Sequence, residues 1–84
     1  MSPGEPLMES MLEYVAKGLV DKPDEVRVVR SEREGALVFE LHVAPDDVGK
    51  VIGRQGRIVR ALRTLVRAAG GRMNQRALLE VVED

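Results

Sequence analysis

The chain has 84 residues, a formal net charge of −1, no cysteine and only two aromatic residues, Tyr14 and Phe39. This length, with a hydrophobic content of 44%, is typical of one soluble globular domain. A chain without cysteine has no disulfide framework and no thiolate metal site, and two aromatic rings are too few for a sheet that captures bases by stacking.

The first predicted element is a helix. Apolar residues recur at helical spacing from Leu7 to Val20, and Pro23 ends the pattern because proline cannot continue a helix. Residues 1–6 hold two prolines and a glycine and are expected to form a loose lead-in. We therefore expect one domain at residues 7–84 behind a lead-in at residues 1–6.

A β-hairpin is predicted next. Val26–Arg30 is rich in β-branched residues, and every second residue from Leu37 to Val43 is a large apolar one, which is the clearest strand pattern in the chain. The polar segment Ser31–Gly35 between them ends in glycine, as the loop of a hairpin often does.

Two helices and a last strand follow. A proline and two aspartates open the segment Asp46–Ile52 and predict a short helix, which the glycines after it break. A longer amphipathic helix is predicted over Arg57–Ala69, with Gly70–Gly71 as its C-terminal stop. Leu78–Val82 reads as a short strand, and the sequence leaves the role of the Gly70–Arg76 loop open.

The predicted order is helix, strand, strand, helix, helix, strand. Three strands need helices on one face to bury their apolar side chains. The sequence therefore predicts an α+β fold in which three helices cover one face of a three-stranded sheet.

Charge is unevenly distributed along the chain. Residues 1–47 carry 11 acidic and 5 basic residues, whereas residues 48–79 carry eight basic residues and no acidic one. So concentrated a group of cations is the electrostatic pattern expected of a protein that meets phosphates. Arg60, Arg63 and Arg67 are nevertheless expected to be solvated and paired with acids, because their helix leads away from the glycine turn before it.

The turn Gly53–Gly56 carries the most specific chemistry. Two glycines without Cβ atoms let a phosphodiester backbone approach the main chain, and the helix that starts directly afterwards favours an anion at its first amides. Arg54 adds a charged fork that suits phosphate oxygens, and Gln55 adds a neutral donor.

The segment Val51–Val59, with the sequence VIGRQGRIV, resembles the V-I-G-x-x-G-x-x-[I/V] signature of KH domains. The order of predicted elements resembles a type II KH domain, and the run Val43–Arg57 is similar to that of small bacterial KhpA-type RNA-binding proteins. The resemblance covers about residues 8–83.

This resemblance implies that about four unpaired nucleotides lie in a groove, with the Gly-x-x-Gly loop clamping their backbone. The flanking helices would form one wall, and the hairpin loop Ser31–Gly35 with its adjacent strand would form the other. Arg54 stands where lysine is common in the family. The RNA-binding residues expected are Lys50, Ile52, Gly53, Arg54, Gln55, Gly56 and Arg57. The resemblance further implies an RNA chaperone or post-transcriptional regulator that pairs with itself or with a second KH-containing RNA-binding protein.

Other classes of function are disfavoured. With His42 as its only histidine, the chain cannot assemble the usual three-ligand zinc site, and it has no recognisable nucleophile with a base, so we expect no enzyme, metal, cofactor or small-molecule substrate. No apolar run exceeds four residues, so we expect no membrane span or signal peptide and a cytoplasmic location. One alternative stays open: a protein-interaction module that kept the fold and lost nucleic-acid binding.

Overall fold

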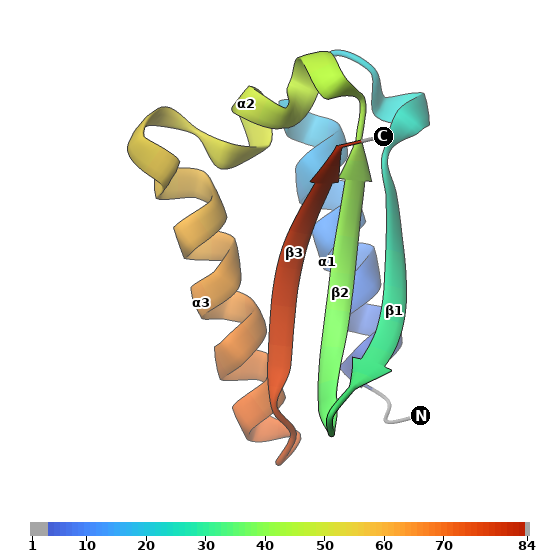
Figure 1. Ribbon diagram of the computed structural model, residues 1–84, viewed down its shortest axis with the longest axis vertical. Helices are drawn as coiled ribbons and strands as arrows, with labels where there is room; N and C mark the ends of the chain where they lie inside the picture. The colour runs from blue at the N-terminus through green and yellow to red at the C-terminus, as the bar shows by residue number, and fades with distance from the viewer. Residues whose placement is uncertain (1–3, 84) are drawn as a thin grey trace.

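The computed structural model describes residues 4–83 and has the predicted α+β architecture (Figure 1). Its elements, in chain order, are α1 (Gly4–Leu19), β1 (Arg27–Arg33), β2 (Ala36–Val43), α2 (Val48–Ile52), α3 (Arg57–Arg72) and β3 (Ala77–Glu83). Short 3-10 turns at Pro23–Glu25, Pro45–Asp47 and Arg54–Gly56 connect them. The predicted order of helices and strands is confirmed.

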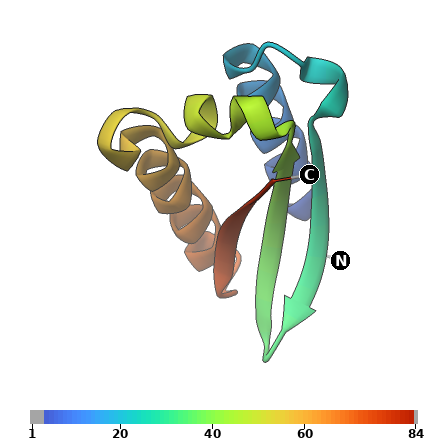
Figure 2. The same cartoon turned by 45° about the horizontal axis from the view of Figure 1, so that its top comes forward.

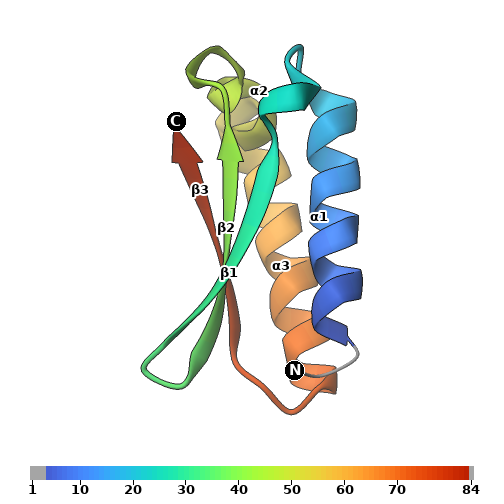
Figure 3. The same ribbon diagram turned by 90° about the vertical axis from the view of Figure 1, so that its right-hand side faces the viewer.

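The sheet has the strand order β1-β2-β3, with β2 in the centre. β1 runs antiparallel to β2, and β3 runs parallel to it, so Phe39 of β2 lies between Arg30 of β1 and Leu79 of β3. Helices α1 and α3 lie side by side on one face of the sheet, and α2 crosses one end (Figure 3). The parallel β2–β3 pair requires a long crossover connection, which α2 and α3 supply.

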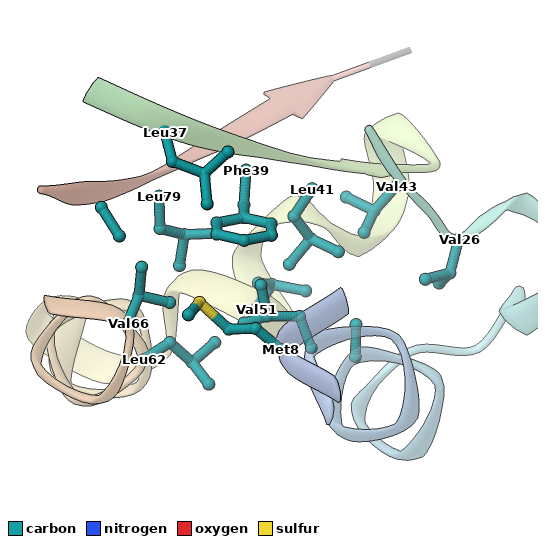
Figure 4. Close-up of a cluster of buried hydrophobic side chains, with 13 residues drawn as sticks. Met8, Val26, Leu37, Phe39, Leu41, Val43, Val51, Leu62, Val66 and Leu79 are labelled. Atoms are coloured by element: carbon teal, nitrogen blue, oxygen red, sulfur yellow. The ribbon is translucent and has the colours of Figure 1, made fainter. Parts of the chain in front are cut away.

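The core lies between the sheet and the helices (Figure 4). The inward side chains of β2 are the residues predicted from its alternation, and Phe39 and Leu41 have no exposed surface. They meet Leu12 of α1 and Val66 of α3, which come from the apolar faces of the two helices. Burial of such side chains is the main favourable term in folding a domain of this size.

Two boundaries in the N-terminal half differ from the sequence prediction. Helix α1 begins at Gly4 rather than Leu7, so residues 4–6 of the expected lead-in are helical, while residues 1–3 lie outside the described part. The expected five-residue loop Ser31–Gly35 is wrong, because β1 continues to Arg33 and only Glu34 and Gly35 form the turn. Both turn residues have positive φ, 52° and 80°, as tight two-residue hairpin turns require.

The expected stop of α3 at Gly70–Gly71 is also wrong, because the helix continues through both glycines to Arg72. Two residues beyond its end, Asn74 adopts a left-handed φ of 56°. The Gln75 amide then donates to the Gly70 carbonyl at 2.8 Å, and the Asn74 amide donates to the Gly71 carbonyl at 3.1 Å. This left-handed cap satisfies the last carbonyls of the helix, so the loop whose role the sequence left open is largely a helix terminus.

No helix within residues 4–83 combines the length and the apolar character needed to cross a membrane.

Candidate nucleic-acid interface

The Gly53–Gly56 loop joins α2 to α3 at the end of the molecule opposite the hairpin turn (Figures 1 and 2). Three of its residues have positive φ: Gly53 at 79°, Gln55 at 56° and Gly56 at 73°. The loop is closed by its own backbone, since the Gly56 amide donates to the Gly53 carbonyl at 3.1 Å. Glycine adopts these angles without strain, whereas Gln55 needs support from its surroundings.

The two glycines serve different purposes. A Cβ on Gly53 would lie 2.6 Å from Cγ1 of Ile58, so the side of Gly53 where a Cβ would stand is already filled by a core-facing side chain. A Cβ on Gly56 would meet nothing closer than Nε of Arg60 at 3.9 Å. The sequence predicted room for a phosphate at both glycines, but at Gly53 the missing side chain serves internal packing.

The polar side chains of the loop face solvent. Arg54, Gln55 and Arg57 are exposed, and Nη2 of Arg57 donates to Oε1 of Gln55 at 3.2 Å. Ile52, at the end of α2, is half-buried beneath them. Five consecutive expected residues, Gly53 to Arg57, therefore lie together on one exposed turn.

Arg60 belongs to this loop as well, although the sequence placed it on a solvated helix face. Its Nη2 donates to the Gln55 carbonyl at 2.5 Å, and its Nε donates to the Gly56 carbonyl at 3.3 Å. The available signal was its spacing, because a residue four positions after Gly56 lies over the first turn of α3.

Lys50 lies in a different arrangement from the other expected residues. Its Nζ donates to Oδ2 of Asp21 at 2.5 Å and to Oδ1 of Asp47 at 3.4 Å. The hydrogen bond and the charge of Asp21, joined by those of Asp47, raise the pKa of the Lys50 ammonium despite its partial desolvation. Lys50 is thus engaged by two carboxylates of its own chain.

Asp47 is a buried residue near the loop whose structural role the sequence does not reveal. Its side chain is only 1% exposed and accepts the backbone amides of Asp21 at 3.1 Å and Lys22 at 3.0 Å. Burial alone would raise the pKa of this carboxyl, but the two amides and Lys50 outweigh it and hold the pKa below its ordinary value. Asp47 therefore ties the end of α1 to the start of α2, the helix that carries the loop.

The arginines from residue 54 to residue 76 make no ion pair with any carboxylate in the described part of the chain. The expectation that Arg60, Arg63 and Arg67 pair with acids is therefore wrong. Several cations elsewhere are paired: Arg33, for example, bonds both Glu40 at 2.7 Å and Glu80 at 2.9 Å. The unpaired arginines leave a concentrated positive surface along α3.

A groove runs between α3 and β3, lined by Arg63, Arg67, Leu78, Leu79 and Glu80. The sequence placed the second wall of an RNA groove at the hairpin loop and its adjacent strand. The hairpin turn instead lies at the far end of the sheet from Gly53–Gly56, and β1 is the edge strand away from α3 (Figure 1). The strand that faces α3 across this groove is β3, and the hairpin loop expected as the second wall does not line it.

Comparison with known proteins identifies the family of this chain. The family model that describes the KH domain of KhpA and KhpB matches residues 9–81. The chain belongs to the KhpA/KhpB family of KH domains. The RNA-binding protein KhpA of Clostridium acetobutylicum is 49% identical to it over 75 residues, which cover 89% of this chain and 100% of the relative.

Two further KhpA/KhpB family members show the same likeness. The RNA-binding protein KhpA of Aquifex aeolicus is 49% identical over 76 residues, 90% of this chain and 96% of the relative. That of Streptomyces coelicolor is 53% identical over 66 residues, 79% of this chain and 84% of the relative. The likeness therefore covers nearly all of the fold, including the Gly53–Gly56 loop.

This KH domain shows no cluster of three or more His, Asp or Glu side chains that could hold a metal ion within its described residues.

Proposed function

We propose that this KH domain binds single-stranded RNA and that its Gly53–Gly56 loop grips the backbone of about four nucleotides. The observation that carries the proposal is the exposed turn with Arg54 and Gln55 at its tip, continued by arginines that no carboxylate neutralises. The relatives are named RNA-binding proteins, which supports the same substrate class. The protein would act in the cytoplasm as an RNA chaperone or post-transcriptional regulator, without catalysing a reaction.

The strand would run from the loop into the groove between α3 and β3. Arg54 and Arg57 would meet the first phosphates, and Arg63 and Arg67 lie farther along the same helix face. Leu78 offers a partly exposed apolar contact for a base on the opposite side of the groove. Apolar contacts and hydrogen bonds, rather than aromatic stacking, would thus hold the bases.

A charge reversal at the tip of the loop tests this proposal. R54D/Q55D should abolish RNA binding in a fluorescence-anisotropy titration with a short single-stranded RNA, because two carboxylates would face the phosphates. Both side chains are exposed, so the fold measured by circular dichroism should survive.

The matched control is S10D/K17D, which makes the same change in formal charge at exposed positions of α1. It should leave most of the affinity intact. Equal losses in the two variants would show that only net charge matters and would refute a specific grip by the loop. A wild-type protein that retains no RNA at low salt would favour the protein-interaction alternative.

A second surface supports self-association. An apolar groove of about 420 Å³ lies between α1 and α3, and Leu7 and Leu65 at its border are 72% and 52% exposed. We propose a second copy of this chain as its occupant, because α1 carries a net negative charge and α3 carries five arginines. A two-fold pair that lays α1 on the partner's α3 would oppose these charges and bury both leucines.

The oligomeric state tests the pairing. Light scattering after size exclusion should show a concentration-dependent dimer for the wild type and a monomer for L65E, which puts a charge into the groove. T64E introduces the same charge at a neighbouring exposed position and should still dimerise. A wild-type monomer at every concentration would contradict self-association and would leave the groove to a second KH-containing chain.

A further inference from the structure

We infer that Arg60 is a positioning residue that holds the Gly53–Gly56 loop in its binding conformation before RNA arrives. This inference rests on the proposed RNA binding and adds a residue of α3 to the loop. The guanidinium is a rigid planar fork, and two of its N–H groups reach two consecutive carbonyls, those of Gln55 at 2.5 Å and Gly56 at 3.3 Å.

The need for such a clamp follows from the backbone. Gln55 and Gly56 are consecutive left-handed residues, with φ of 56° and 73°. Glycine adopts this region freely, but a Cβ makes it unfavourable, so the backbone of Gln55 is strained there and favours another conformation. No side chain caps the start of α3, which leaves the Arg60 fork as the side chain that bonds the loop carbonyls.

The clamp also places charge where RNA would be bound. Arg60 is exposed and makes no ion pair with a described carboxylate. The partial negative charge of a carbonyl oxygen repels phosphate. Because the Arg60 guanidinium covers the carbonyl oxygens of Gln55 and Gly56, an anion is more favourable beside these two residues. Lysine at this position would keep the charge, but its single ammonium lacks the fork that spans two adjacent carbonyls.

Substitutions that separate charge from geometry test the inference. R60K and R60Q should both weaken binding of a short mixed-sequence single-stranded RNA, by about five- to tenfold if the free loop then adopts the competent form only 10–20% of the time. Arg63 provides the matched pair, because it is exposed on the same helix and bonds no loop atom. There R63K should weaken binding less than R60K does, because a lysine at that position can still meet a phosphate, and R63Q should lose only the contribution of its charge.

A measurement without RNA makes the two proposals separable. In NMR spectra of the free protein, R60K and R60Q should change the HN–Hα coupling of Gln55 and speed amide exchange at Gly56, while the Arg63 variants leave both unchanged. Unaltered loop signals in R60Q, or wild-type affinity in R60K, would overturn the inference. If the Arg60 variants alter the loop signals but the wild-type protein binds no RNA, the role of Arg60 in the loop is supported and the RNA-binding proposal is refuted.

Discussion

Asp47 shows how one buried side chain can help to position a loop, here Gly53–Gly56, that it does not touch. Its carboxylate accepts two backbone amides from the α1–β1 connection and also contacts Lys50 one turn along α2. Buried carboxylates are tolerated only when their oxygens are satisfied in this way. The orientation of α2, and with it the start of the loop at Gly53, therefore depends on a residue far from the loop's tip.

This network predicts a stability that depends on acid pH. The pKa of Asp47 is lowered in the folded protein, so its contribution is present above the unfolded value of about 3.9 and is lost as the pH falls through the folded pKa. D47N should lower Tm by roughly 5 °C or more at pH 7, and the gap to the wild type should narrow as the pH approaches 3. Thermal denaturation followed by circular dichroism measures both.

D46N is the control for this experiment. Asp46 is exposed, and its one ion pair among the described residues is with Lys22 at 3.4 Å. Surface pairs of this kind contribute little, so D46N should behave almost as the wild type does at every pH. A D47N deficit that stays constant from pH 7 to pH 3 would contradict the assignment of the stabilising form to the carboxylate.

At the scale of elements, the two glycines at the end of α3 have opposite roles although they are adjacent in sequence. Gly70 is buried, and a Cβ there would lie 2.6 Å from the Gln75 carbonyl and 2.7 Å from Cβ of Ala77. Gly71 is exposed, and a Cβ there would meet nothing within 4 Å. Gly70 therefore allows β3 to begin directly against α3. Gly71 has no such packing role, and as a glycine it only lowers the stability of the helix.

We expect opposite signs for the two alanine substitutions. G70A should destabilise the protein by about 1–3 kcal/mol, because the loop backbone and Ala77 must move to admit a methyl group. G71A should stabilise it by about 0.5–1 kcal/mol, because alanine favours the helix and has less freedom in the unfolded chain. Urea denaturation reports both free energies of unfolding, and equal effects at the two positions would contradict the packing role of Gly70.

The same elements show what could be predicted from the sequence. The alternation along β2 and the helical spacing in α1 and α3 located the core, because these patterns are local. The sequence predicts a helix stop at Gly70 and Gly71, because no local signal reveals that β3 packs against Gly70. The ion pair between Lys50 and Asp21 could not be predicted either, because the two residues are 29 positions apart in the sequence and only the folded chain brings them together.

At the scale of the whole molecule, cations fall into two groups. Several in the rest of the chain, such as Lys17 and Arg33, bond carboxylates at 2.7 Å and 2.9 Å, whereas the arginines from residue 54 to residue 76 have no carboxylate partner among residues 4–83. A net charge near zero therefore coexists with a strong local positive field. Such a field attracts polyanions even to a protein that is formally acidic.

The salt dependence of RNA affinity should reveal whether the unpaired arginines or the cations paired with carboxylates contact RNA. Three or four phosphate contacts on a single strand predict a log–log slope of about −2 to −3 for affinity against salt. R54Q/R57Q should reduce the magnitude of that slope by about 1.4, because two contacts are lost. R33Q, which removes a cation already held by Glu40 and Glu80, should leave the slope unchanged. A slope unaffected by R54Q/R57Q would contradict phosphate contact at the loop.

The packing of Ile58 against Gly53 has a consequence for behaviour on heating. Ile58 also packs against the core, so the loop conformation and the core share one side chain. The loop then has little freedom to melt on its own, and the capacity to hold a ligand should vanish at the same temperature as the tertiary structure. Warming should therefore leave no temperature interval in which the domain stays folded while the Gly53–Gly56 turn has lost its shape.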